Sequence, residues 1–178
     1  MRLFVAVPVP DEVRDAVVPA LAGVRGDDRV AWTRPDGWHA TVAFLGEVDD
    51  GALADVVAAV RVGTTGMSPF GLTTAAVGTL ARGTALVVDL DEDPDGAMVA
   101  LGAAVQESLG DAGFDVARRR VRPHLTLGRA RRRGRVPEDV VAAVDVPATS
   151  WVVAHLAVVR SVLGDGPATY LTVGRVDL

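Results

Sequence analysis

Two of the three histidines lie in nearly identical short runs, one in each half of the 178-residue chain. His39 and His124 are each followed by one residue, a threonine, an apolar residue and, soon after, a glycine. Histidine titrates near neutral pH, so one imidazole can take a proton from an attacking water while the other gives one to a departing oxygen. The hydroxyls of Thr41 and Thr126 can donate hydrogen bonds to phosphate oxygens. The doubled motif therefore suits cleavage of a phosphoester.

Both motifs lie in apolar runs that predict strands, Trp38–Leu45 and Val121–Arg129. Alternate side chains of a strand share a face, so each histidine is expected beside its threonine on one face. If the two halves are related by a pseudo-twofold axis, the two polar faces meet across a cleft. The side chains expected on the opposite, core-facing side are Ala40, Val42 and Phe44 in the first strand and Leu125 and Leu127 in the second.

The charge of the chain is unevenly distributed. The net charge of −5 argues against a polyanionic partner, yet nine of the 18 basic residues, all arginines, lie between Arg118 and Arg135, where there is no acid. Guanidinium groups bind phosphate by paired hydrogen bonds, although such a run can equally be a solvated loop. Arg122, two residues before His124, is the first candidate for phosphate binding. Further candidates for RNA contacts are Arg118, Arg120, Arg129 and Arg131.

Other uses of the histidines are weaker alternatives. Each could be an ordinary strand residue, but two matching copies make that interpretation the minority one. A metal could recruit an acid such as Asp89, yet the chain has no H-E-x-x-H spacing, and without cysteine it has no thiolate ligand. We expect no metal and no other cofactor. His155 lies in an apolar run with no threonine two residues on, and we expect it to be structural.

The pattern of elements predicts an α+β fold. Apolar residues make up 49% of the chain, enough for one packed domain over residues 1–178, built of two lobes that each carry one motif. Short turns between strands predict antiparallel sheets with helices on the outside. Beyond the motif strands, expected strands are 3–9, 29–33, 70–80, 84–90, 151–159 and 168–176, and expected helices are 11–26 (with Pro19 inside), 49–62, 97–109 and 137–144.

At the two histidine motifs the sequence resembles the 2H phosphoesterase superfamily, and within it the bacterial RNA 2′,3′-cyclic phosphodiesterases, first known as 2′-5′ RNA ligases. The resemblance covers almost the whole chain. Small departures are Ala40 and Ala43, where the family often has bulkier apolar residues. The residues that carry it are the opening 2–6, the first motif and its continuation to Val48, Pro69-Phe70, and Arg122 to Leu127.

The resemblance implies two lobes, each an antiparallel sheet with helices outside, and an active site in the cleft between them. It implies hydrolysis of an RNA 2′,3′-cyclic phosphate end to a 2′-phosphomonoester without a metal. It makes His39 the proton donor to the leaving 3′ oxygen and His124 the proton acceptor that activates water, with Thr41 and Thr126 on the phosphate. The residues alone leave these two roles interchangeable, because the motifs are nearly symmetric.

Two other functions stay open. One is the same chemistry on another substrate: ADP-ribose cyclic phosphate, a small cyclic nucleotide, or RNA ligation in the reverse direction. The other is a non-catalytic RNA-binding module that keeps the fold. The expected partner is RNA or a nucleotide with a 2′,3′-cyclic phosphate end. No run reaches the roughly 20 apolar residues that span a bilayer, so we expect no membrane partner. We also expect the protein to be cytoplasmic and monomeric.

Overall fold

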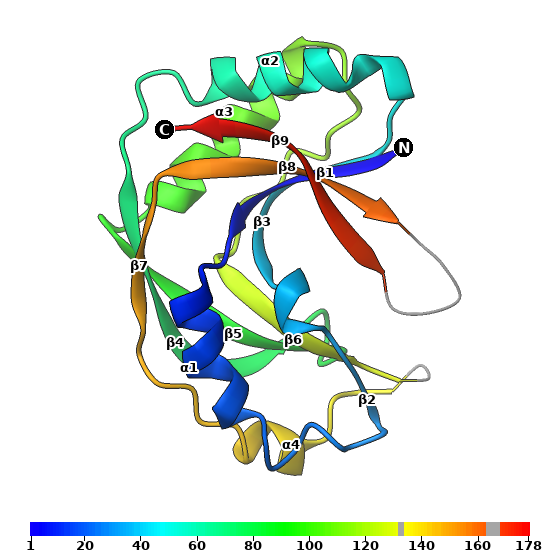
Figure 1. The fold of residues 1–178 in the computed structure, drawn as a ribbon, viewed down its shortest axis with the longest axis vertical. Coiled ribbons are helices and arrows are strands. Elements are labelled where there is room, and N and C mark those ends of the chain that lie inside the picture. The colour runs from blue at the N-terminus through cyan, green and yellow to red at the C-terminus, as the bar shows by residue number, and fades with distance from the viewer. Residues whose placement is uncertain (132–133, 163–167) are drawn as a thin grey trace.

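The computed structural model describes residues 1–131, 134–162 and 168–178, in which strands and helices alternate (Figure 1). The helices are α1 (Asp11–Ala20), α2 (Leu53–Gly63), α3 (Ala97–Asp111) and α4 (Glu138–Ala142), with short 3-10 helices η1 (Pro35–Gly37) and η2 (Asp50–Ala52). The strands are β1 (Arg2–Pro8), β2 (Val30–Trp32), β3 (His39–Glu47), β4 (Phe70–Leu80), β5 (Ala85–Asp93), β6 (His124–Ala130), β7 (Ser150–Val153), β8 (His155–Val162) and β9 (Thr169–Asp177).

The strands form two antiparallel sheets, which confirms the predicted α+β class. The four-stranded sheet has the order β3-β1-β8-β9, and the five-stranded sheet has the order β2-β6-β5-β4-β7. In Figure 1 the first sheet lies above the second. The sheets do not follow the halves of the chain, because β2 precedes the first motif yet pairs with β6, while β8 and β9 come from the C-terminal end and join β1. Each sheet carries one of the two motif strands.

One expected strand is in fact two. Residues 151–159 were predicted as a single strand, but the chain leaves the extended pairing at Ala154, so that β7 pairs with β4 in one sheet and β8 pairs with β1 in the other. The apolar pattern is continuous across this point because both sheets bury their residues. Local periodicity therefore could not show that the chain passes from one sheet to the other here.

Proline shortens two other predicted elements. The helix expected over 11–26 ends at Ala20, and the first two bonds after it run from residue i to i−3, as in Ala22 N–H to the Pro19 carbonyl oxygen at 3.1 Å. Proline has no N–H to donate to the carbonyl oxygen four residues earlier, so Pro19 weakens the last turn of α1. The strand expected from Val121 begins only at His124, directly after Pro123, which cannot donate to the ladder.

The core is shared by the two sheets. One cluster of buried side chains joins Leu156 of β8 to Leu125 of β6 and to Leu101 of α3. Helices α2 and α3 pack on each other and cover the upper sheet (Figure 1). Within the described ranges, no helix combines the length and the apolar character needed to cross a membrane.

Candidate active site

The first motif histidine is held from three sides. His39 is the first residue of β3, and its Nδ1 lies 2.8 Å from the carbonyl oxygen of Gly37. A carbonyl oxygen only accepts, so Nδ1 carries the proton and donates, which leaves the lone pair of the neutral ring on Nε2. The half-buried ring lies 4.6 Å from the Phe4 ring and meets the Tyr170 ring edge to face at 5.1 Å. These contacts fix the orientation of the imidazole.

The second motif histidine is held in the same way by the backbone. His124 is the first residue of β6, and its Nδ1 lies 2.6 Å from the carbonyl oxygen of Arg122. In both motifs the acceptor is the residue two positions before the histidine. Both neutral rings are therefore the same tautomer, with Nε2 as the proton-accepting atom.

A β-bulge follows the threonine in each motif strand. The pairing of β3 with β1 passes from Thr41 to Ala43 and leaves out Val42. The pairing of β6 with β5 leaves out Leu127 in the same way, directly after Thr126. Bulges are common beside active sites, where they re-aim side chains. Each histidine and its threonine precede the bulge, so the shared face that was expected for them is kept.

The bulge makes one core prediction wrong. Phe44 was expected beside Val42 in the core, but its side chain is 63% exposed. Val42 and Ala43 are both buried, so the alternation of inward and outward residues changes phase at the bulge. Strict alternation holds only along a regular strand, and here one inserted residue turns Phe44 to the other face.

The carbonyl oxygens of the two bulge residues have partners from elsewhere in the chain. Nε2 of Gln106, on α3, donates to the carbonyl oxygen of Val42 at 2.9 Å, and its Oε1 accepts from the N–H of Arg119 at 2.8 Å. The N–H of Thr33 donates to the carbonyl oxygen of Leu127 at 2.9 Å. Because Gln106 makes both hydrogen bonds of its amide, it links the first motif strand to the segment that leads into the second, and its side chain is only 5% exposed.

The two histidines interact electrostatically. Strands β3 and β6 contact each other although they belong to different sheets. Burial lowers the pKa of His39 below its ordinary value of 6.5, the hydrogen bond to Gly37 opposes that effect, and the positive charge of His124 lowers it further. The structure therefore brings the two imidazoles close enough for the charge of one to affect the other.

Thr41 and Thr126 are half-buried, each two residues beyond its histidine and just before the bulge. The two strands thus offer two imidazoles and two hydroxyls from two different sheets. Chemically, such a set can accept one proton, donate another, and supply neutral hydrogen-bond donors to a charged group held between them.

Arg122 is already engaged. Its guanidinium donates two hydrogen bonds to Asp89, at 2.9 and 3.1 Å, and Asp89 is the residue of β5 that pairs with His124. The expected phosphate contact would therefore compete with, or share, this ion pair. The same ion pair engages Asp89, the acid that the sequence analysis considered as a metal ligand.

The arginine-rich segment does not form one patch. Arg118 and Arg120 lie over α3 in one shallow surface hollow, where Arg118 also contacts Asp111 at 3.5 Å. Arg129 and Arg131 line a different pocket with residues of β2 and β9. Arg132 and Arg133 lie outside the described residues. The four arginines considered for RNA contacts therefore fall into two pairs, which line two different hollows of the surface.

No group of three or more histidine, cysteine, aspartate and glutamate side chains is gathered closely enough to hold a metal ion anywhere in residues 1–131, 134–162 and 168–178. His155 is on β8, opposite Asp177, and burial lowers its pKa. His155 therefore lies outside both motif strands.

Sequence reasoning missed the side chains that support the first histidine. Phe4 and Tyr170 belong to a small apolar cluster of β1, β8 and β9, and nothing local to His39 signals them. Tyr170 is the one tyrosine of the chain but lies far from both motifs in sequence. Gln106 had a usable signal, because it is the polar residue among the apolar positions that α3 buries.

Comparisons with known proteins agree with this architecture. A sequence model of the 2'-5' RNA ligase superfamily matches residues 9–165. An Archaeoglobus fulgidus protein named RNA 2',3'-cyclic phosphodiesterase is 34% identical over 142 residues, which are 79% of this chain and 79% of the relative. A Thermus thermophilus protein of the same name is 30% identical, with 100% of this chain and 90% of the relative covered.

Among solved structures, E. coli LigT complexed with 3'-AMP superposes with a TM-score of 0.80 and 23% identity, over 99% of this chain and 97% of that chain. At that identity the likeness concerns the fold, and it agrees with the two antiparallel sheets described above. The match to the superfamily covers most of the chain and includes both histidine motifs. The chain belongs to the 2'-5' RNA ligase superfamily.

Proposed function

We propose that this protein is a phosphodiesterase that hydrolyses the 2′,3′-cyclic phosphate end of RNA to a 2′-phosphomonoester. The observation that carries the proposal is the matched pair of His39 and His124, each with Nδ1 bound to the carbonyl oxygen two residues before it. This matched geometry supports a reaction that needs two proton-transfer groups with available Nε2 atoms. The names of the relatives from Archaeoglobus fulgidus and Thermus thermophilus support the substrate.

In the proposed reaction, Nε2 of His124 takes a proton from water as the water oxygen bonds to phosphorus. The bond between phosphorus and the 3′ oxygen breaks, and Nε2 of protonated His39 donates its proton to that oxygen. The product has a free 3′ hydroxyl and a 2′ phosphate, and solvent restores both imidazoles. Thr41 and Thr126 donate to the non-bridging oxygens, where negative charge is concentrated.

The lowered pKa of His39 agrees with this role once substrate is bound. Burial keeps the imidazole of the free enzyme neutral down to a lower pH than usual. The cyclic phosphate carries a negative charge, and an opposite charge nearby favours the protonated imidazole. Substrate binding therefore recruits the proton that the leaving oxygen needs.

The proposed site needs one chain and both sheets. β3 supplies one histidine and β6 the other, and the core that joins the sheets is continuous. We therefore treat residues 1–178 as one functional domain that acts without a second copy.

The proposal is tested by hydrolysis of 2′,3′-cyclic AMP with identification of the product. His39→Ala and His124→Ala are expected to lose activity by a factor of roughly 10²–10⁴, the usual contribution of a general acid or base. His155→Ala is the matched control, because His155 is also a half-buried histidine but lies on β8, outside both motif strands. Release of the 3′ phosphomonoester, or wild-type rates in both motif variants, would refute the proposal. Binding of RNA with no turnover across pH 5 to 9 would favour a non-catalytic module.

A further inference from the structure

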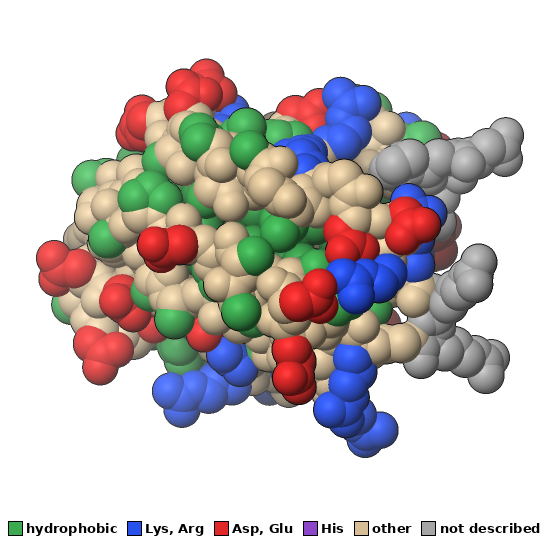
Figure 2. Space-filling view, turned by 90° about the horizontal axis from the view of Figure 1, so that it is seen from below, with side chains coloured by type: hydrophobic (Ala, Val, Ile, Leu, Met, Phe, Trp, Pro, Cys, Tyr) green, Lys and Arg blue, Asp and Glu red, His purple; other side chains and the backbone are tan. Residues whose placement is uncertain are grey.

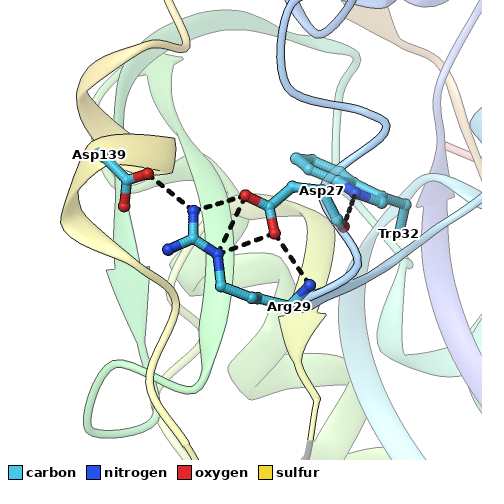
Figure 3. Close-up of polar contacts among 4 residues, drawn as sticks. All are labelled: Asp27, Arg29, Trp32 and Asp139. Carbon is cyan, nitrogen blue, oxygen red and sulfur yellow. Dashed lines mark hydrogen bonds and ion pairs between the residues drawn. The ribbon is translucent and has the colours of Figure 1, made fainter.

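Ion pairs between arginine and aspartate are common on the surface of this protein, and by themselves they indicate no function. Figure 2 shows acidic and arginine side chains interspersed over the face that carries α4. Arg29, for example, binds Asp27 and also reaches Asp139 of α4 at 2.7 Å (Figure 3). Exposed pairs of this kind contribute little to stability. A pair near the histidines has a role in the reaction only if it is connected to one of them.

The ion pair of Asp89 and Arg122 has such a connection. One guanidinium nitrogen of Arg122 donates to both carboxylate oxygens of Asp89, at 2.9 and 3.1 Å. The main-chain carbonyl oxygen of the same arginine accepts the hydrogen bond from His124 Nδ1 at 2.6 Å. Arg122 therefore joins a carboxylate of β5 to the imidazole of β6, through its side chain at one end and its backbone at the other.

The sheet places Asp89 beside His124 but does not hold Arg122. Asp89 and His124 are opposite each other in the antiparallel pair of β5 and β6, and directly opposed side chains project from the same face. His124 is the first residue of β6, so Arg122 lies before the strand and outside its pairing with β5. The ion pair with Asp89 therefore links Arg122 to β5 where the ladder of the sheet does not.

The chain neighbours of Arg122 restrict its backbone only in part. Val121 is buried in the core, and the carbonyl oxygen of Pro123 accepts from the N–H of Leu90 at 3.1 Å. Proline also confines the residue before it to extended conformations. These contacts involve neither the carbonyl nor the side chain of Arg122. In the part of the chain that the structure describes, Asp89 supplies the one carboxylate that binds Arg122.

The first motif fixes the corresponding carbonyl in a different way. Gly37, which accepts from His39 Nδ1, belongs to the 3-10 helix η1, and its own N–H donates to the carbonyl oxygen of Arg34 at 2.9 Å. The first acceptor is therefore part of a hydrogen-bonded turn. The second acceptor lies in residues 114–123, which form neither a helix nor a strand nor a turn. There a side-chain contact takes the place of the turn.

The orientation of His124 decides whether its Nε2 can accept a proton. A neutral imidazole with its proton on Nδ1 has its lone pair on Nε2, and the other tautomer lacks it there. In the proposed reaction that lone pair takes the proton of the attacking water. The hydrogen bond that the other ring nitrogen makes sets which nitrogen is protonated. A carbonyl that moves away from Nδ1 therefore weakens the base.

We propose that Asp89 is a positioning residue, whose ion pair with the Arg122 guanidinium fixes the Arg122 carbonyl that orients His124. The inference rests on the proposed function and extends it. Arg122 serves the reaction through its backbone, and its guanidinium holds that backbone to β5 instead of binding the substrate phosphate. Asp89 itself touches no reacting atom.

The first test compares kcat and KM for 2′,3′-cyclic AMP in Asp89→Ala and the wild type. We expect KM not to rise and kcat to fall roughly tenfold, because groups that hold a working histidine through hydrogen bonds contribute at about that level. Asp89→Glu keeps a carboxylate for Arg122 and is expected to recover most of kcat. Asp139→Ala is the matched control, because it removes an aspartate from the Arg29 pair outside both motif strands and is expected to leave kcat unchanged.

Arg122→Ala separates the two possible uses of the arginine, because it removes the guanidinium and keeps the carbonyl. It is expected to lower kcat by the same factor as Asp89→Ala, and the double variant is expected to lower kcat no further, as for two groups that act as a unit. If the guanidinium instead binds phosphate and Asp89 competes for it, Asp89→Ala raises kcat/KM and Arg122→Ala raises KM. That pair of results would overturn the proposal.

A second readout needs no activity. In nitrogen NMR spectra of labelled histidine in the substrate-free protein, with the rings neutral, we expect His124 to carry its proton on Nδ1 in the wild type and to be a mixture of tautomers in Asp89→Ala. His39 is the internal control, because its acceptor Gly37 lies outside this network. An unchanged His124 tautomer, or a wild-type kcat, in Asp89→Ala would overturn the proposal. If the wild type does not hydrolyse the cyclic phosphate, the proposed function fails, and the tautomer alone decides whether Asp89 positions His124.

Discussion

The amide Nε2 of Gln106 donates to the carbonyl oxygen of Val42 at 2.9 Å, although the two residues are 64 positions apart in the chain. Val42 is the bulge residue of the first motif strand, so it lacks a partner in the pairing with β1. The other end of the same amide accepts the N–H of Arg119, five residues before His124. One buried side chain thus connects the backbones near both histidines.

Replacing Gln106 with Leu is expected to destabilise the fold and slow the reaction. The substitution leaves the Val42 carbonyl and the Arg119 N–H without their partner, which costs about 1–3 kcal/mol per buried group. If Gln106 positions the motifs, kcat falls with little change in KM. Denaturant unfolding and steady-state kinetics measure the two effects. Ser108→Ala on the same helix removes a hydrogen bond to Ala59 and is expected to leave kcat unchanged; equal kcat in the two variants would contradict a positioning role.

Because of the bulge in β3, substitutions at two adjacent residues are expected to differ strongly in their effect on the free energy of unfolding. Phe44 is 63% exposed, so Phe44→Ser is expected to change the free energy of unfolding by only about 0.5 kcal/mol or less. Leu45 is 6% exposed, and Leu45→Ala is expected to cost about 2–4 kcal/mol. Regular alternation without the bulge predicts the reverse order, which chemical denaturation of the two variants would reveal.

Gly128, which follows the bulge in β6, is expected to tolerate no side chain. A Cβ there would lie 2.7 Å from Cγ1 of Val30 and 3.2 Å from the carbonyl oxygen of Ala31, both on β2. Gly128→Ala therefore pushes β2 away from β6, at an expected cost of about 1–3 kcal/mol. Gly78→Ala on β4 is the matched control, because a Cβ there meets nothing within 4 Å. Thermal unfolding of both variants makes the comparison, and equal midpoints would show that β2 does not pack as described.

The lowered pKa of His39 predicts where activity declines on the alkaline side. As proton donor, His39 must be protonated, so kcat/KM, which reports the free enzyme, is expected to fall through a pKa below 6.5. In the kcat profile the same limb is expected at higher pH, because bound phosphate stabilises the imidazolium. A low-pH limb that rises with pH and disappears in His39→Ala would instead make His39 the base and reverse the two roles.

The sequence was sufficient to predict most of the fold, because strand and helix patterns are local. The apolar alternation predicted the strands that carry His39 and His124, and the threonines beside them. It could not predict the bulges at Val42 and Leu127, since no residue type there marks an inserted position. The wrong prediction that Phe44 lies in the core follows from the undetected bulge at Val42. Nor could it show that β7 and β8 belong to different sheets, because a residue buried in either sheet has the same apolar character.

The sequence offered the candidate reacting groups of the site but not the side chains that surround them. The histidines and threonines share short motifs, whereas Tyr170 and Gln106 reach the first motif from distant elements through tertiary packing. The sequence left open whether the arginine-rich segment binds phosphate or is a solvated loop, and the fold separates the arginines of this segment. Arg118 turns toward α3, Arg122 binds Asp89, and Arg129 and Arg131 face the pocket beside β2. Proximity in sequence does not determine which surface a side chain joins.

The central claim is that His39 and His124 act as an acid and base pair without a metal. The most direct measurement is kcat/KM for 2′,3′-cyclic AMP from pH 5 to 9, with a chelator present, for the wild type and both alanine variants. The wild type is predicted to give a bell-shaped profile that the chelator does not change, and each variant is predicted to lose one limb together with most of the rate. Loss of wild-type activity on chelation, or a full bell-shaped profile in either variant, would contradict the claim.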